Sequence, residues 1–201
     1  MTRRLFIAIN ASEPLVKTFP PTLKKLKINA DRRDMAVKWV PLENLHVTLA
    51  FIGERPSEDI PVIEEIMKSI SAKIPAFDLK VEDMGAFSSE QDARVLWLGV
   101  QNKKILNQLR DELIEGLDQG DLLFREEVRP YVPHLTIGRL KNPRSVKDMI
   151  SPFKRKSFGK IHINEIVLYE SRIQGAFPVY TPVLRYQLLG QPEINETESV
   201  L

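Results

Sequence analysis

The sequence predicts an α+β fold with a mainly antiparallel sheet and helices on its outer faces. Short runs with strand-like composition alternate with longer stretches whose apolar residues recur at helical spacing. The rhythm of the first half of the chain is repeated in the second half. No change of composition and no linker divides the chain, so we expect residues 1–190 to form one domain. The polar, acidic residues 191–201 are expected to be a disordered tail.

In the first half, the expected elements are a strand (4–9), a helix (12–28), two strands (37–40 and 45–52), a helix (57–74) and a strand (77–87). Pro20 and Pro21 must break or restart the first helix, since proline lacks the N–H group that a helix interior requires. The second helix carries a stripe of isoleucine and methionine, and Ser57 or Asp59 is its expected cap.

In the second half, the expected elements are a strand (94–100), a helix after residue 102, a strand (133–140), a short helix (145–150) and two strands (161–170 and 183–189). Residues 88–92 supply turn chemistry between the strands on either side. Asn102 is the expected cap of its helix, whose leucines recur at helical spacing from Leu106 to Leu117.

Composition excludes several classes of function. The chain has no cysteine, which rules out disulfides, thiolate metal sites and cysteine nucleophiles. No apolar run is long enough to span a bilayer, and the run from Leu5 to Ile9 is too short for a signal peptide. We therefore expect a cytoplasmic protein that does not enter the membrane.

Positive charge is concentrated locally, although the net charge is only +2. Residues 139–160 contain eight basic residues and one acid: Arg139, Lys141, Arg144, Lys147, Lys154, Arg155, Lys156 and Lys160, with Asp148. Such an excess suits a phosphate backbone, but taken alone it is more typical of a solvated basic face.

Two of the three histidines lie in nearly identical surroundings, 88 residues apart. His46 and His134 each begin a His-apolar-Thr-apolar stretch, in which the threonines are Thr48 and Thr136 respectively. On a strand, residues i and i+2 point to the same face. Each histidine therefore shares a face with its threonine, and two such strands facing each other would line a cleft with two imidazoles and two hydroxyls.

Two imidazoles are suited to phosphoryl transfer. A neutral histidine can take a proton from water while a protonated one gives a proton to the leaving oxygen, and both forms exist near neutral pH. The hydroxyls can bind the phosphate oxygens. Because the protein supplies both acid and base, we expect no metal and no cofactor.

Other interpretations compete with this one. A lone histidine on a strand is usually a surface or core residue, and threonine is a common strand former. A metal site is disfavoured, since no carboxylate or third histidine stands at ligand spacing from His46 or His134. His162 lacks a following threonine and is interpreted as structural.

At these residues the sequence resembles the 2H phosphoesterase superfamily, and within it the bacterial and archaeal RNA 2′,3′-cyclic phosphodiesterases, also described as 2′-5′ RNA ligases. Nearly the whole chain takes part in the resemblance. The matching segments are 4–9, 39–46, 94–100, 133–136, 168–171 and Tyr180. The interrupted first helix departs from the family, which puts the local helix geometry in doubt rather than the chemistry.

The resemblance implies a bilobal, pseudo-twofold fold with an antiparallel sheet in each lobe, helices outside and the active site in the central groove. It implies that His46 and His134 are the acid/base pair and that Thr48 and Thr136 bind phosphate. The implied reaction converts 2′,3′-cyclic phosphate ends to 2′-phosphates, with 2′-5′ ligation as its reverse. The implied partners are RNA ends, tRNA fragments among them, and we expect a monomer.

Phe51 and Arg139 each lie five residues after a motif histidine. A ring and a guanidinium in equivalent positions could hold a nucleobase between them, and a flanking arginine is also a feature of the family. Five is an odd number, so a regular strand would turn both side chains away from the histidines. Gly138 permits a bend, Ala50 less readily, and the alternative for Phe51 is a place in the core.

Two further functions stay open. The chain could act on small cyclic or 2′-5′-linked nucleotides, a choice that the motifs do not settle but that the basic run disfavours. It could also be a non-catalytic module that binds RNA ends, although a mere binder has no need of two titratable groups.

Overall fold

The computed structural model describes residues 1–11, 13–122, 130–174 and 177–190. The expected disordered tail, 191–201, lies outside the described residues. The described strands are β1 Thr2–Asn10, β2 Val37–Trp39, β3 His46–Pro56, β4 Phe77–Ser88, β5 Ala93–Gln101, β6 His134–Arg144, β7 Ser157–Ile163, β8 Glu165–Gln174 and β9 Phe177–Gln187. The α-helices are α1 Glu13–Thr18, α2 Pro20–Asp31, α3 Ile60–Ser71, α4 Lys104–Gln119 and α5 Lys147–Ile150.

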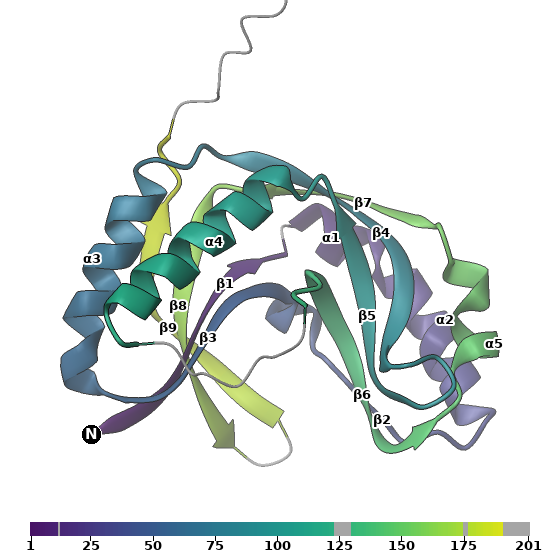
Figure 1. Ribbon diagram of the computed structural model, residues 1–201. Coiled ribbons are helices and arrows are strands. Elements are labelled where there is room, and N and C mark those ends of the chain that lie inside the picture. Colours follow the sequence, from purple (N-terminus) through teal and green to yellow (C-terminus); the bar gives the residue numbers. More distant parts are fainter. Residues whose placement is uncertain (12, 123–129, 175–176, 191–201) are drawn as a thin grey trace, which may run out of the picture.

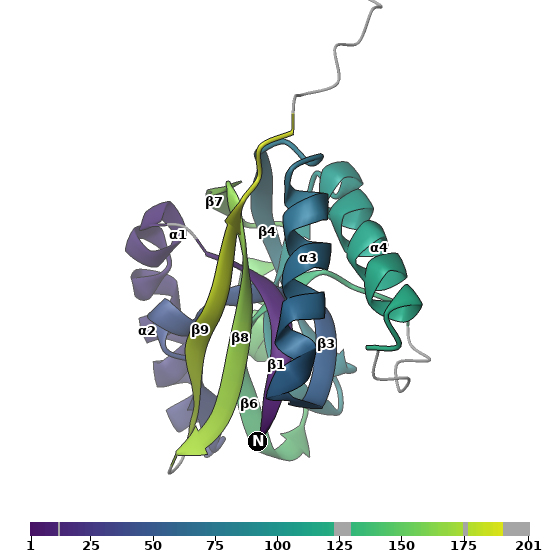
Figure 2. The same cartoon turned by 90° about the vertical axis from the view of Figure 1, so that its left-hand side faces the viewer.

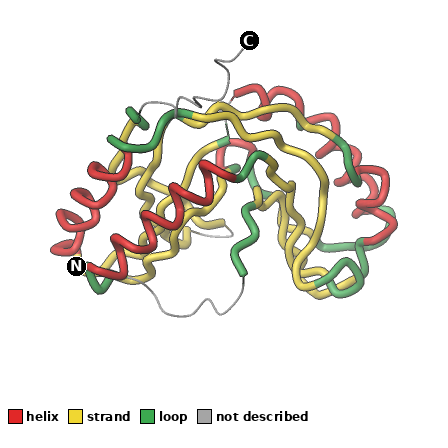
Figure 3. Tube along the Cα trace, turned by 45° about the horizontal axis from the view of Figure 1, so that its top comes forward, coloured by secondary structure: helices red, strands yellow, loops and turns green. Residues whose placement is uncertain are grey.

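The strands form one curled antiparallel sheet in the order β7-β4-β5-β6-β3-β1-β8-β9, with β2 paired to β6. The sheet bends into an arch with the helices on its outside (Figures 1 and 3). The α+β class is therefore confirmed. The expected sheets of the two lobes are continuous with each other, joined where β3 meets β6 through the pair Val47 and Leu135.

Each lobe has its own helices on its outer face. In the lobe of β3, β1, β8 and β9, α3 packs against β8 and β9 and α4 against β3, and the two helices lie side by side (Figure 2). In the other lobe, α1 packs against β7 and α2 against α5. Leucines at positions 106, 109, 113 and 117 form the buried stripe of α4, as the helical spacing predicts.

The break at Pro20 and Pro21 is confirmed. The helix α1 ends at Thr18, and α2 begins at Pro20. Proline is well placed there, because the first residues of a helix have no intrahelical partner for their N–H groups. The interruption thus produces two helices on the same lobe instead of one.

Three details differ from the sequence prediction. The expected strand over 161–170 is two strands, because the chain turns at Asn164 and continues in the other lobe. Asn102 does not cap α4: it adopts a positive φ of 63°, which asparagine tolerates, and the helix begins after Lys103. Asp59 precedes α3 but makes no side-chain cap hydrogen bond.

Ser57, the other expected cap of α3, is engaged elsewhere. Its hydroxyl donates a hydrogen bond to the Met1 carbonyl at 3.1 Å. The residue belongs to a short 3₁₀ turn, Ser57–Asp59, that precedes the helix. It therefore ties the end of β3 to the start of β1 rather than capping α3.

Candidate active site

His46 and His134 occupy the first positions of β3 and β6. The Nδ1 atom of His46 lies 2.7 Å from the Asn44 carbonyl oxygen, and that of His134 lies 2.6 Å from the Val132 carbonyl oxygen. A carbonyl oxygen only accepts hydrogen bonds, so each Nδ1 must carry the proton. In the neutral ring, Nε2 is then the unprotonated nitrogen, which can accept a proton from a substrate or from water.

The two motifs face each other across the junction of the lobes. In the antiparallel register fixed by Val47 and Leu135, His46 stands opposite Thr136 and Thr48 opposite His134. Val47 and Leu135 are buried, so the histidines and threonines share the other face of the sheet, the inner face of the arch. Side chains at opposite and diagonal positions of such a pair lie within roughly 4.5–8 Å of each other. The expected four-residue constellation is therefore brought together.

An irregularity in strand pairing occurs at equivalent positions of β3 and β6, and it explains how residues five positions after each histidine can share the histidine face. Between Ile7 and Ala8 the partner on β3 changes from Ala50 to Thr48, which leaves Leu49 as an extra residue. Between Leu96 and Trp97 the partner on β6 changes from Gly138 to Thr136, which leaves Ile137 as an extra residue.

These β-bulges lie three residues after each histidine and reset the alternation of faces. Phe51 stands opposite Phe6 and Arg139 opposite Val95, so both side chains reach the inner face. Phe51 is 45% exposed, and the alternative that it belongs to the core is therefore wrong.

Aromatic rings flank His46 on the inner face. The ring centroids of Phe6 and Tyr180 each lie 5.3 Å from that of His46, and Phe51 stacks on Phe6 at 6.0 Å. The guanidinium of Arg4 lies over the Phe51 ring at 5.6 Å. Sequence reasoning assigned no role to Phe6 or Tyr180; the available signal was aromatic residues on strands predicted to be half-buried.

His134 has a comparable wall in the other lobe. Its ring centroid is 4.9 Å from that of Phe87 and 6.4 Å from that of Trp97. A Cβ built on Gly85 would come within 2.2 Å of the Trp97 ring, so this glycine provides the space in which the indole lies. Neither Phe87 nor Trp97 was singled out for the site from the sequence.

The environment of His46 favours its neutral form. Burial is the main cause that lowers the pKa of His46 below 6.5, and the positive charges of His134 and Arg139 lower it further. The hydrogen bond to the Asn44 carbonyl opposes this shift. The register places Arg139 on the inner face together with the histidine pair, so its positive charge can act on His46.

The basic run is divided by the fold. Arg139, Lys141 and Arg144 lie on β6. Lys154 forms an ion pair with Glu90, and Lys156 approaches the hydroxyl of Thr22 at 3.3 Å. The run therefore does not form a single basic face.

Other features lie outside this constellation. His162 on β7 contacts Asp78 on β4, with 2.8 Å between Nδ1 and Oδ1, and both side chains are exposed. In the part of the chain that the structure describes, no three His, Asp or Glu side chains are grouped so as to hold a metal ion. Within the same residues, no helix has the length and apolar character needed to cross a membrane.

Known proteins share the sequence pattern of this chain along most of its length. The model of the 2′-5′ RNA ligase superfamily matches residues 19–173. A protein of Methanothermobacter thermautotrophicus named RNA 2′,3′-cyclic phosphodiesterase is 32% identical over 195 residues, covering 94% of this chain and 100% of that protein.

Solved structures show the same fold. A crystal structure of the Thermus thermophilus protein TT0787 superimposes with a TM-score of 0.79 at 25% identity, covering 94% of this chain and 100% of the other. Escherichia coli LigT complexed with NADP⁺ has a TM-score of 0.66 at 25% identity, covering 94% and 99% of the two chains.

Proposed function

The chain belongs to the 2′-5′ RNA ligase superfamily, and on that premise we propose that it hydrolyses 2′,3′-cyclic phosphate ends of RNA to 2′-phosphates. The observation that carries the proposal is the matched geometry of His46 and His134. Both rings hold their Nδ1 proton on a carbonyl two residues upstream and keep Nε2 for chemistry. Such a pair supplies a base and an acid on opposite sides of one reacting group.

In the proposed reaction, one neutral histidine takes a proton from water through Nε2, and the water oxygen forms a bond to phosphorus. The bond from phosphorus to the ribose 3′ oxygen breaks, and that oxygen receives a proton from the other, protonated histidine. The product carries a 2′-phosphate and a 3′-hydroxyl. Thr48 and Thr136 bind the non-bridging oxygens and hold phosphorus in line between the two rings. Each step is completed by protein side chains, so no metal or cofactor is required.

The terminal nucleobase is proposed to lie between Phe51 and Arg139. The bulges bring both side chains to the inner face, and Arg139 acts electrostatically on His46 and Tyr180. An aromatic ring and a guanidinium plane both stack on bases without requiring a particular sequence.

The proposed substrates are RNA ends, tRNA fragments among them. The protein is proposed to act as a monomer in the cytoplasm. Ligation of RNA ends through a 2′-5′ linkage is the same chemistry in reverse.

The test uses a short RNA ending in a 2′,3′-cyclic phosphate, incubated in excess EDTA with wild type, His46→Ala, His134→Ala and His162→Ala. Loss of a general acid or base costs about 10²–10⁴-fold in rate. We expect a 2′-phosphate product from wild type and from His162→Ala, which alters the histidine outside the site, and a loss of that size in the other two variants. Full activity in either motif variant, or dependence of the wild type on added metal, would contradict the proposal.

A further inference from the structure

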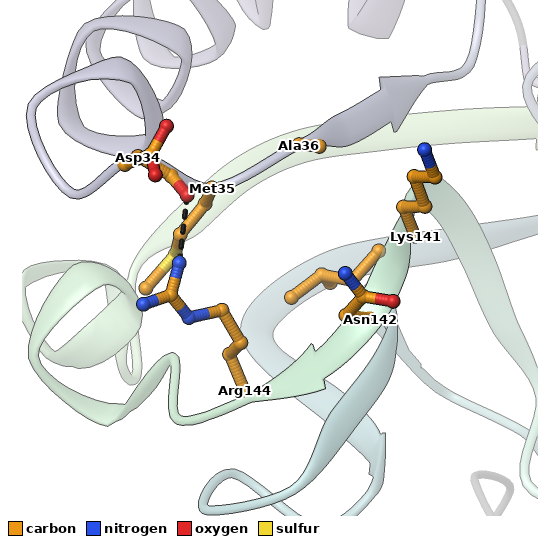
Figure 4. A pocket seen from close by; sticks show the side chains of 7 residues that line it. Asp34, Met35, Ala36, Lys141, Asn142 and Arg144 are labelled. Atoms are coloured by element: carbon orange, nitrogen blue, oxygen red, sulfur yellow. Dashed lines mark hydrogen bonds between the residues drawn. The ribbon is translucent and has the colours of Figure 1, made fainter.

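The edge formed by β2 and β6 borders two adjoining hollows of about 400 Å³ and about 270 Å³. They share the side chains of Ala36, Leu140 and Lys141. The larger hollow is bounded by Arg139, which is also one of the two side chains of the proposed base site. The smaller one, shown in Figure 4, extends to Arg144 at the end of β6.

Basic side chains gather on the same face of this edge as the histidines. Lys38 on β2 stands directly opposite Arg139 on β6, and both line the larger hollow. Lys141 lies two residues beyond Arg139 and shares its face, about 6.5–7 Å further along the strand. Like charges directly opposite each other on a sheet are destabilising, and an anion bound between them removes that repulsion.

Arg144 continues the series into the smaller hollow. One of its nitrogens donates a hydrogen bond to the Asp34 carbonyl oxygen at 2.7 Å, which fixes the guanidinium against the segment before β2 (Figure 4). A guanidinium has five N–H donors, so the remaining ones can bind an anion. The Asp34 carboxylate, which also lines this hollow, makes it less favourable for a phosphate than the larger one.

The opposite edge of the same lobe has a different character. On β4, Lys80 lies 2.8 Å from Glu82. His162 on β7 lies 2.8 Å from Asp78. Basic and acidic side chains are therefore neighbours at that edge, whereas Lys38, Arg139 and Lys141 line one hollow at the β2–β6 edge. A polyanion leaving the groove is therefore attracted toward the β2–β6 edge.

We propose that the RNA strand on the 5′ side of the cyclic phosphate leaves the active site along β2 and β6, with its phosphates on Lys38 and Lys141. The inference rests on the proposed function. A 2′,3′-cyclic phosphate is the 3′ end of its chain, so every other phosphate lies on its 5′ side and follows one exit. The natural substrate is then an oligonucleotide, since a cyclic mononucleotide has no second phosphate to place on this edge.

The experiment compares kcat/KM for a pentaribonucleotide ending in a 2′,3′-cyclic phosphate with kcat/KM for cytidine 2′,3′-cyclic monophosphate. The variants are Lys141→Gln, the double variant Lys38→Gln/Lys141→Gln and Lys27→Gln, an exposed lysine of α2 on the outside of the arch, as control. We expect the double variant to lose about tenfold on the pentanucleotide and less than about twofold on the mononucleotide. For the pentanucleotide, the slope of log(kcat/KM) against log salt is negative. Each phosphate contact removed should make this slope shallower by about 0.7.

Circular dichroism and thermal unfolding check that the variants are folded. Equal losses on both substrates, or no loss on either, would overturn the proposed exit. If the wild type cleaves neither substrate, the proposed function fails while the exit can still be tested. Fluorescence anisotropy with a labelled pentanucleotide ending in a 2′-phosphate then decides: a reduced salt slope in the double variant supports the exit, and an unchanged slope rejects it.

Discussion

At the scale of single residues, the site depends on where protons are held. Each motif histidine donates its Nδ1 proton to a carbonyl two residues upstream, at 2.7 Å for His46 and 2.6 Å for His134. These hydrogen bonds fix both the orientation and the tautomer of each ring, since a carbonyl oxygen can only accept a hydrogen bond. The surroundings then decide whether the ring is charged. Burial of the His46 ring disfavours its imidazolium form, and the positive charges of His134 and Arg139 disfavour it further.

The His46 ring is expected to titrate with a pKa below 6.5 in the free protein, as followed by NMR of its ring proton. In Arg139→Gln the midpoint should rise, because a nearby positive charge is removed, but it should stay below 6.5 because burial is the larger cause. Lys27→Gln, which alters a distant charge, should leave the midpoint unchanged. A midpoint of 6.5 or higher in the wild type would show that this account of the ring is wrong.

The same shift makes stability depend on pH. Below pH 6.5 the unfolded chain protonates His46 before the folded chain does, so the unfolded state binds more protons in the interval between the lowered pKa and 6.5. The free energy of unfolding should therefore fall as pH decreases through this interval. Urea unfolding of wild type and His46→Gln between about pH 5 and 8 measures the effect, and the variant should show a weaker dependence. Identical pH profiles of unfolding free energy in the wild type and His46→Gln would show that His46 is not the source of the pH dependence.

At the scale of elements, the two motif strands are built alike. Each carries one extra buried residue three positions after its histidine, Leu49 in β3 and Ile137 in β6. The bulge is what allows a side chain at odd spacing to return to the inner face. Next to β6 in the same sheet, β5 and β4 support His134 through Trp97 and Phe87, and Gly85 leaves room for the indole.

Gly85→Ala should disturb this support. The new methyl group would fall 2.2 Å from the Trp97 ring, so the indole must move. We expect a loss of about 1–3 kcal/mol in the free energy of unfolding and a change in Trp97 fluorescence, measured in a Trp39→Phe background. Gly120→Ala, whose nearest contact is the flexible tip of Leu122, should change stability by less than about 1 kcal/mol. Unchanged fluorescence in Gly85→Ala would contradict the assigned packing.

At the scale of the whole molecule, the proposed active site lies where two lobes share a sheet. The pair Val47 and Leu135 is the contact that sets β3 against β6, and the proposed acid and base, His46 and His134, each adjoin one member of this pair. The relative position of the histidines is therefore determined by a junction rather than by either lobe alone. The proposed exit along β2 and β6 lies in one of these lobes, the lobe that also contains β4, β5 and β7.

Leu135→Ala tests the junction. Leu135 and Leu113 are both fully buried, so either truncation should cost about 2–5 kcal/mol. Leu113 lies in α4 and belongs to neither of the two junction strands. At a temperature where both variants remain folded, we expect Leu135→Ala to lose cyclic phosphodiesterase activity at least about tenfold more than Leu113→Ala, since small misplacements of reacting groups are costly. Equal activities in the two variants would show that the junction does not control the histidine geometry.

Much of this architecture could be predicted from local pattern. Runs of strand-like composition identified β1, β3, β4, β5 and β6. At the start of β3 and β6 the alternation of buried and partly exposed residues also follows directly from the sequence. The prediction of a single strand over 161–170 was wrong. The segments before and after Asn164 both have strand-like composition, and only their pairing partners reveal the turn between them. The aromatic walls of the histidines were missed because they join residues from strands distant in the chain.

The sequence by itself determined which side chains can do chemistry: two histidines, each sharing a strand face with a threonine, follow from spacing and the period of a strand. Tertiary structure alone decided that these faces meet, that bulges bring Phe51 and Arg139 to them, and that Lys38 stands opposite Arg139. The physical reason is that register and bulges are properties of paired strands. They depend on backbone hydrogen bonds to distant segments, which the local alternation of one strand does not record.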